Sequence, residues 1–357
     1  MARFLPFQPI FKNNMILNDL RTMMLRDWLE NDCLLNVTKC EPASNDASFR
    51  RYFRVTIDDK TFIAMDAPPD KENIAPFMRI ATLFKDANVN TPTLLRHNLE
   101  DGFILLEDFG SQWLLDELNN ENATELYQRA LQGLLPLHTD ELLLNADLPA
   151  YDETVLRREM ALFEEWFVEQ LLDEELLPDL WESVQKILIK SALEQPIVCV
   201  HRDYHSRNLM VLPNGELGVL DFQDAVLGAL TYDIVSLLRD CYINWSDDKI
   251  EMWLHDYFEQ LQQAKVVECD FAQFKRWFDL MGMQRHLKAI GIFARLHLRD
   301  EKSAYLQSIP RTFNYVIQVC GAYPELQAFQ TILENLNLDS LRKKLTFANH
   351  STNAIIN

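Results

Sequence analysis

The sequence predicts an α+β fold of two lobes: a small N-terminal lobe with an antiparallel β-sheet and a packed helix, and a larger, mainly helical C-terminal lobe. Three observations indicate it. The 357 residues exceed the usual content of one hydrophobic core. Strand-like alternation gathers in the N-terminal part, whereas helical periodicity dominates later. Hydrophobic residues make up 48% of the chain, which leaves ample material for burial.

The N-terminal lobe is expected to span residues 1–107, of which residues 1–40 form a helical extension. Apolar residues at helical spacing predict a helix over 18–29, and alternation over 49–57 followed by Asp58-Asp59 and an apolar run over 61–65 predicts a β-hairpin. A helical period over 71–88 predicts the packed helix. Residues 102–109 predict a buried strand that ends in the charged residues Glu107 and Asp108, and we expect the boundary between the lobes at this point.

The C-terminal lobe is expected to span residues 108–357. Periodicity predicts helices over 113–119, 123–139, 153–173 and 178–193, and a long helical tail broken near residues 245–246 and Pro310. Between them, apolar runs joined by an Asn214-Gly215 turn predict strands and a hairpin.

Polar residues are concentrated in two short segments at the ends of these strands, residues 201–208 and 221–224. Asp203 and Asn208 are five residues apart, and Asp221 follows eighteen residues after Asp203. This set suits phosphorylation of a hydroxyl: Asp203 would accept the proton, while Asn208 and Asp221 would hold magnesium on the phosphates. The alternative is that Asp203 and Asn208 cap a turn, as such residues often do.

Residues 201–208, 221–224 and 232–238 resemble the catalytic loop, metal-binding segment and following helix of the aminoglycoside phosphotransferase and choline kinase branch of the protein-kinase-like superfamily. Residues 46–55, 64–69 and 284–296 resemble, within that branch, the bacterial kinases that phosphorylate N-acetylmuramate and N-acetylglucosamine on the anomeric C1 hydroxyl during cell-wall recycling. The resemblance covers most of the chain. It implies a bilobal protein-kinase-like fold, ATP and Mg²⁺, and Asp233 bracing the catalytic loop through backbone hydrogen bonds, with a helix N-cap as the alternative for Asp233.

The expected ATP-binding residues depart from the superfamily pattern. Residues 43–48 contain no glycine, so small residues such as Ser48 would approach the phosphates, and Met65 or Asp66 stands where a phosphate-binding Lys is expected. We expect Arg51 or Arg54 to supply the missing positive charge, because arginine binds phosphate through a forked geometry. The alternative is that Arg51 and Arg54 lie on a solvent-exposed face of the sheet and do not bind phosphate. The backbone at Glu107 is expected to bind adenine.

Further residues are candidates for contacts around the reacting groups. Arg207 and His205 are expected to contact the transferring phosphoryl group, with a surface position as the alternative for Arg207. Arg285 and His286 belong to a basic cluster that would suit an acidic group, such as the lactyl carboxylate of N-acetylmuramate. The alternative is that the cluster pairs with acidic residues of the protein and has a structural role. The remaining candidate substrate contacts are Glu159, Trp166, Tyr204 and Asp224. The alternatives are a helix salt bridge for Glu159 and a core position for the aromatic ring of Trp166.

Composition limits the possible partners and location. A formal net charge of -20 disfavours nucleic acid or an anionic membrane as a partner. The six cysteines show no C-x-x-C spacing and are expected to be reduced, and neither a signal peptide nor a run of ~18 apolar residues is evident. We expect a cytoplasmic, monomeric enzyme acting on a small molecule. The alternatives are an aminoglycoside, homoserine or choline kinase, or a pseudokinase that only binds nucleotide.

Overall fold

The computed structural model describes residues 20–44, 49–338 and 341, and it divides into two compact units. The first unit comprises Met1–Lys85 with Thr91–Gly110, and the second comprises Asp86–Asn90 with Ser111–Asn357. Asn90 belongs to the second unit because its carbonyl accepts the Val219 N–H at 2.8 Å and its side chain donates to the Leu217 carbonyl at 3.0 Å.

A five-stranded antiparallel sheet forms the frame of the first unit, in the order β1-β2-β3-β5-β4. The strands are β1 Val37–Ser44, β2 Arg51–Ile57, β3 Lys60–Asp66, β4 Leu94–Asn98 and β5 Phe103–Glu107. The predicted hairpin is confirmed: β2 pairs with β3, and both turn residues, Asp58 and Asp59, have positive φ angles of 47° and 64°. Two left-handed residues in a two-residue turn match the twist of the strands.

The N-terminal helix covers one face of this sheet. It runs over residues 20–27 and continues into η1 (Trp28–Asp32), and Leu25, Trp28 and Leu29 pack into one buried cluster with strand residues such as Phe53 and Val55. The other predicted helix of this lobe is α2 (Ala75–Asp86), shorter than expected, because the Asn73 side chain accepts the Ala75 N–H at 2.9 Å and begins the helix there.

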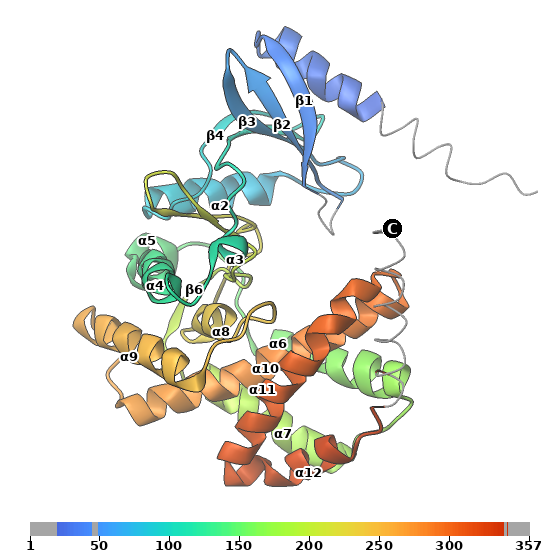
Figure 1. Ribbon diagram of the computed structural model, residues 1–357, viewed down its shortest axis with the longest axis vertical. Coiled ribbons are helices and arrows are strands. Elements are labelled where there is room, and N and C mark those ends of the chain that lie inside the picture. The colour runs from blue at the N-terminus through green and yellow to red at the C-terminus, as the bar shows by residue number, and fades with distance from the viewer. Residues whose placement is uncertain (1–19, 45–48, 339–340, 342–357) are drawn as a thin grey trace, which may run out of the picture. The chain divides into compact units, whose positions relative to one another are not determined.

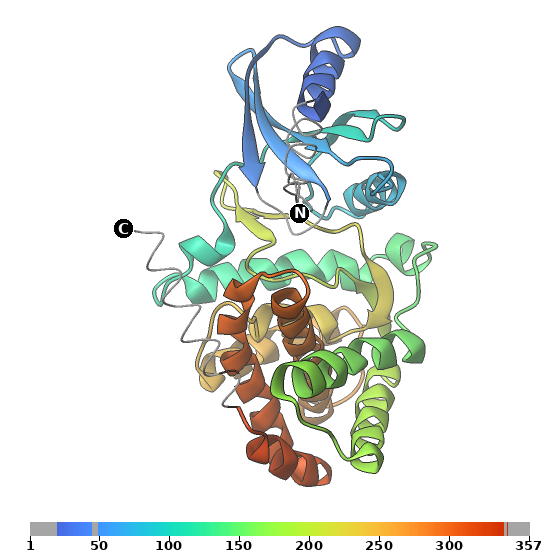
Figure 2. The same ribbon diagram turned by 90° about the vertical axis from the view of Figure 1, so that its right-hand side faces the viewer.

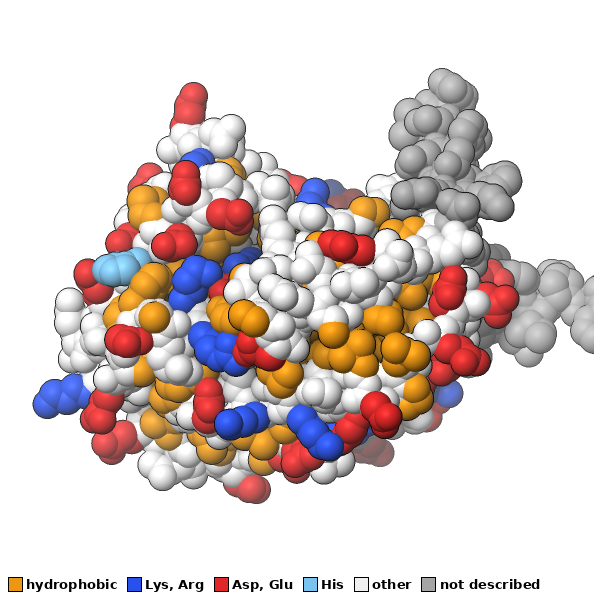
Figure 3. Space-filling view, turned by 90° about the horizontal axis from the view of Figure 1, so that it is seen from below, with side chains coloured by type: hydrophobic (Ala, Val, Ile, Leu, Met, Phe, Trp, Pro, Cys, Tyr) orange, Lys and Arg blue, Asp and Glu red, His pale blue; other side chains and the backbone are white. Residues whose placement is uncertain are grey.

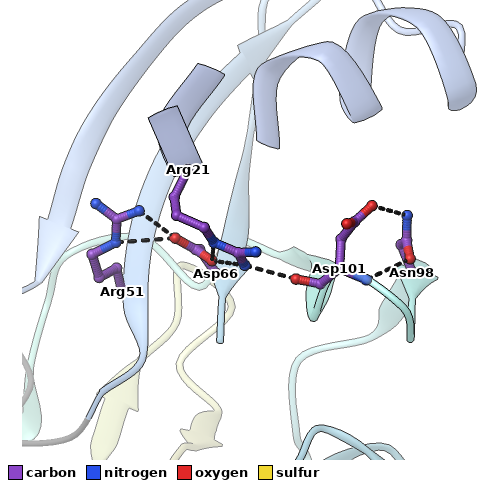
Figure 4. A network of polar contacts seen from close by, with 5 residues as sticks. All are labelled: Arg21, Arg51, Asp66, Asn98 and Asp101. Atoms are coloured by element: carbon purple, nitrogen blue, oxygen red, sulfur yellow. Dashed lines mark hydrogen bonds and ion pairs between the residues drawn. The ribbon is translucent and has the colours of Figure 1, made fainter. Parts of the chain in front are cut away.

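A buried carboxylate ties the N-terminal helix to the sheet. Asp66, at the end of β3, is fully buried and accepts hydrogen bonds from the guanidinium groups of Arg21 and Arg51 (Figure 4). Arg21 also donates to the Asp101 carbonyl at 2.6 Å. Two cations therefore share one carboxylate, which has no contact with water.

The second unit is mainly helical, as predicted, and the long helix α10 (Phe271–Leu298) lies at its centre (Figures 1 and 2). Gly291 allows close packing of α10: a Cβ there would lie 2.3 Å from the Leu162 backbone. The other elements are α3 Leu114–Glu117, α4 Ala123–Thr139, α5 Glu141–Leu144, α6 Glu153–Leu162, η2 Phe163–Leu172, α7 Pro178–Leu193, α8 Tyr232–Leu238, α9 Asp247–Gln263, η3 Ser303–Ser308, α11 Ile309–Ala322, η4 Pro324–Leu326 and α12 Gln327–Asn335.

Two short strand pairs hold the loop over residues 201–208. β6 (Ile197–Val200) pairs with β9 (Val226–Ala229), and β7 (Leu209–Val211) pairs with β8 (Leu217–Val219), all antiparallel. The predicted Asn-Gly turn joins β7 to β8, with Gly215 at a φ of 82°. The loop thus begins directly after β6 and ends directly before β7.

On the face shown in Figure 3, acidic side chains are interspersed with basic and apolar ones. Within the described residues, no helix is both long enough and apolar enough to cross a membrane.

Candidate active site

The carboxylate of Asp233 braces the start of the loop, as predicted. One of its oxygens accepts the His201 N–H at 2.6 Å and the other accepts the Arg202 N–H at 3.0 Å. Arg202 has a φ of 77°, a left-handed conformation that costs a non-glycine residue about 1–2 kcal/mol. The N-cap of α8 is Thr231, so the two buried hydrogen bonds are the contribution of Asp233 and the capping alternative falls away.

His201 joins the loop to the segment after β8. Its Nδ1 lies 3.3 Å from the Asp203 N–H and its Nε2 lies 3.0 Å from the Leu220 carbonyl. Burial lowers the pKa of His201 to about 4, so the ring is neutral at pH 7. Since Nδ1 accepts, Nε2 carries the proton and donates to Leu220.

Asp240 fixes the middle of the loop. One of its carboxylate oxygens accepts both the N–H and the hydroxyl of Ser206, and the other accepts the Tyr242 N–H at 2.9 Å. The Ser206 carbonyl in turn accepts the Leu115 N–H at 3.1 Å. Asp233 therefore holds the backbone before Asp203, and Asp240 holds the backbone after it.

Asn208 and Asp221 lie opposite each other at the open end of the β7–β8 hairpin. The Leu220 N–H donates to the Asn208 carbonyl at 2.9 Å, and the Asn208 amide nitrogen donates to the Asp203 carbonyl at 3.0 Å, which reserves its Oδ1 as an acceptor. Asp221 has a φ of 60° and accepts the Gln223 amide at 3.0 Å. One amide oxygen and one carboxylate fit Mg²⁺, which takes few protein ligands beside phosphates and water.

Asp203 lies at the edge of a cavity of about 120 Å³ in the second unit. The cavity is lined by Asp203, His205, Tyr232, Asp240, Cys241, Tyr242, Arg285, Lys288, Ala289, Ile292 and Phe293. Burial raises the pKa of Asp203, but the nearby cations Lys288 and Arg285 outweigh it and hold the pKa below its ordinary value. Asp203 is therefore a carboxylate at neutral pH and can accept a hydrogen bond from a hydroxyl in the cavity.

A buried ion-pair cluster lies behind this cavity. Glu159 pairs with Arg202 at 2.6 Å and with Lys288 at 3.0 Å, and it accepts the Tyr151 hydroxyl. Burial raises the pKa of Glu159, but Lys288 and Tyr151 more than offset this and lower it. These contacts place Glu159 in the framework that positions Arg202 and Lys288, rather than among direct substrate contacts.

Other candidate residues lie away from the cavity lining. Tyr204 is fully buried and donates to the Ala130 carbonyl at 2.8 Å, and His286 is buried with its Nε2 2.9 Å from the Arg239 carbonyl and its ring stacked on Tyr315. Both positions correct the expectation of a substrate contact, because these side chains are fully buried in the core and do not line the cavity. Trp166 is half-buried in η2, and Asp224 is exposed and accepts the Gln223 amide at 3.2 Å.

Arg207 and His205 both contact Tyr242. The exposed Arg207 guanidinium lies 3.9 Å from the Tyr242 ring centroid, and the His205 ring meets Tyr242 edge-on at 5.4 Å. Burial lowers the pKa of His205, and its Nδ1 has no hydrogen-bond partner within the described residues. His205 is thus a neutral group with free hydrogen-bonding capacity at the cavity.

The two candidate arginines of the first unit lie on opposite faces of the sheet, because residues three apart in a strand alternate. Arg51 shares the face of Phe53, which the N-terminal helix covers, and binds Asp66. Arg54 lies on the other face and makes a forked pair with Asp108 at 2.7 and 3.0 Å, while also donating to the Gly110 carbonyl.

Glu107 and Ser48 are the last two residues that the sequence proposes for ATP binding. The Glu107 N–H already donates to the Thr93 carbonyl at 2.9 Å, and its exposed side chain accepts the Thr93 N–H at 3.2 Å. Ser48 lies outside the described residues.

Sequence reasoning named Arg285 of the cavity wall but missed its apolar residues and those from the segment after α8. Arg285, Lys288, Ala289, Ile292 and Phe293 follow one another at intervals of three, one, three and one along α10, which places them on one helix face. That spacing was visible in the sequence. Cys241 and Tyr242, by contrast, come from the irregular segment after α8, whose approach to α10 no local pattern indicates.

The two-unit fold, with a five-stranded antiparallel sheet and a catalytic-type loop between short hairpins, is that of protein-kinase-like small-molecule kinases. Among solved structures, a choline kinase from Streptococcus pneumoniae matches with a TM-score of 0.61 at 13% identity, covering 85% of this chain and 100% of that one. An ADP-bound aminoglycoside phosphotransferase matches with a TM-score of 0.55 at 13% identity, covering 82% and 97%. The predicted fold class is confirmed.

Sequence comparison identifies the family. The model of the phosphotransferase enzyme family matches residues 39–267, and the chain belongs to this family. A relative from Pseudomonas putida named N-acetylmuramate/N-acetylglucosamine kinase is 44% identical over 334 residues, which cover 89% of this chain and 97% of the relative. A relative of the same name from Neisseria meningitidis is 39% identical, covering 88% and 96%. The chain is thus a kinase that uses ATP.

Proposed function

We propose that this kinase transfers the γ-phosphate of ATP to the anomeric C1 hydroxyl of N-acetylmuramate and N-acetylglucosamine. The observation that carries the proposal is the cavity beside Asp203, which combines a carboxylate base, two cations and an apolar wall within the second unit. Relatives at 39–44% identity over nearly their whole length bear the name of this activity.

In this proposal Asp203 acts as the base. Its lowered pKa keeps it ionised, and a sugar hydroxyl in the cavity would donate its hydrogen bond to it and lose its proton as the phosphorus–oxygen bond forms. Asp233 and Asp240 hold the loop backbone, so that Asp203 does not reorganise during the reaction. Arg207, beside Asn208, would stabilise charge on the transferring phosphoryl group.

Asn208 and Asp221 would hold Mg²⁺, which supplies charge neutralisation on the phosphate oxygens. The fit is in the donor set: the Asn208 amide nitrogen is engaged by the Asp203 carbonyl, so its oxygen is available beside a carboxylate. In the first unit, Arg54 would support ATP binding by anchoring Asp108 and Gly110, the segment after β5 expected to bind adenine.

The test is direct assay of the purified chain with ATP and Mg²⁺. Incubation with N-acetylmuramate, N-acetylglucosamine, glucosamine, choline and kanamycin, followed by phosphorus NMR, should show an acid-labile C1 phosphate on the two N-acetyl sugars. Asp203→Asn should lose turnover by about 10²–10⁴-fold and keep ATP binding. Phosphate on choline or kanamycin alone would replace the proposal, and ATP binding without any turnover would indicate a pseudokinase.

We place the chain in the cytoplasm as a monomer within this proposal, because ATP is available there. Phosphorylation of recycled cell-wall sugars would take place in that compartment. Size-exclusion chromatography with light scattering tests the monomer.

A further inference from the structure

We infer that Arg285 is the receptor for a carboxylate on the acceptor sugar, and that it sets the preference for acidic over neutral amino sugars. The inference rests on the proposed function, since it concerns the sugar that the cavity accepts. Arg285, on α10, would thus determine specificity for a sugar that carries a short, branched carboxylate side chain.

The first support comes from comparing the buried cations of this region. Arg202 and Lys288 pair with Glu159 at 2.6 and 3.0 Å, and Arg239 pairs with Asp279 at 2.8 Å. Arg285 is only 6% exposed, yet within the described residues it has no carboxylate within 4.0 Å. Asp203 and Asp240 are near enough to stabilise its charge, but neither forms a direct ion pair with it, so that the direct ion pair is left for a ligand.

The second support is the hydrogen-bonding state of Arg285. Its Nε has no partner among the described residues, and its guanidinium lies 5.9 Å from the centroid of the Tyr232 ring. The nearby carboxylate of Asp240 is already occupied by Ser206 and by the Tyr242 N–H. Arg285 therefore lines the cavity with its Nε donor free, and a planar guanidinium matches a carboxylate.

The third support is the wall beside Arg285. Ala289, Ile292 and Phe293 follow it on the same face of α10 and line the same cavity. A carboxylate attached to a methyl-bearing carbon, as in a lactyl ether, would place its charge on Arg285 and its methyl group against these apolar side chains. The cavity, about 120 Å³, far exceeds the roughly 10–15 Å³ that one water molecule needs.

Kinetics with two matched sugars test the inference, because N-acetylmuramate differs from N-acetylglucosamine by its lactyl group. Arg285→Gln should raise the KM for N-acetylmuramate about 10- to 100-fold, in keeping with loss of a charged hydrogen bond, and change the KM for N-acetylglucosamine less than about threefold. Arg239→Gln is the matched control: it removes a buried arginine whose partner is in the protein and should leave the ratio of the two constants unchanged.

A neutral ligand gives an independent measurement on the unmodified protein. The methyl ester of N-acetylmuramate should bind the wild type about 10- to 100-fold more weakly than the acid does, and this comparison needs no variant. Equal binding of acid and ester by the wild type would overturn the inference. An equal loss for both sugars in the variant, or a raised KM for ATP, would also overturn it by assigning Arg285 to Asp203 or to the nucleotide. If the wild type phosphorylates neither sugar, the proposed function itself fails.

Discussion

Replacing Asp233 by Asn should uncouple the catalytic loop from its brace. Asp233 accepts two backbone N–H groups, of His201 and Arg202, and Arg202 is held at a φ of 77°. An amide has only one oxygen, so at least one of these N–H groups loses its acceptor. Loss of a buried hydrogen bond to a charged group costs about 1.5–3 kcal/mol.

We expect a loss of about 3 kcal/mol in Asp233→Asn, the upper end of this range, because the new amide N–H donors would face one of the two backbone N–H groups. If all of it acts on the transition state, kcat falls about 100-fold, at 1.36 kcal/mol per factor of ten. The midpoint temperature of thermal unfolding should fall by about 6–12 °C for a unit of this size. A coupled ADP-release assay and a thermal melt measure the two effects.

Asp248→Asn provides the matched control, since Asp248 is an exposed acidic residue in the first turn of α9, as Asp233 is in the first turn of α8. Its loss should cost no more than about 1 kcal/mol through the helix dipole. The reasoning fails if Asp233→Asn keeps kcat within threefold of the wild type and melts at the same temperature as the control.

Three further predictions follow from the contacts described. Arg54→Gln should raise the KM for ATP at least about fivefold because it releases Asp108, whereas Arg51→Gln should lower stability and leave that constant within twofold; the reverse pattern would refute the assignment of faces. Gly291→Ala should destabilise by more than about 2 kcal/mol in urea, because its Cβ would lie 2.3 Å from backbone; an unchanged midpoint would contradict the packing. Burial lowers the pKa of His138 to about 3, so the unfolded chain binds a proton at this residue before the folded chain does. The free energy of unfolding therefore falls as the pH drops from ~6.5 towards 3. His138→Gln should flatten that slope by about 1.4 kcal/mol per pH unit, as measured by urea titrations at several pH values.

The sequence predicted the sheet and the loop because both depend on local signals. Alternation over β2 and β3 and the Asn214-Gly215 turn were sufficient to place two hairpins. The polar loop was recognised because Asp203, Asn208 and Asp221 follow one another in the order and spacing of a base and two magnesium ligands. The bracing by Asp233 also followed from the resemblance and is confirmed by two hydrogen bonds.

Contacts between distant segments could not be predicted in the same way. For Glu159 the sequence left open a substrate contact or a helix salt bridge, and its actual partners, Arg202 and Lys288, are cations from other segments. Tyr204 lies in a polar motif, yet it points into the core because the Ala130 carbonyl on α4 offers an acceptor there. Periodicity identifies which face of a helix is buried, but not what lies against that face.

The two cations of the cavity belong to a chain of net charge -20, and this combination affects how fast the substrates arrive. Both ATP and an acidic sugar are anions, so the far field of this protein repels what Arg285 and Lys288 attract at short range. Salt screens the far field beyond about 8 Å at physiological ionic strength, but it scarcely weakens contacts with buried groups. Moderate salt should therefore speed the association of acidic substrates, the opposite of electrostatic steering.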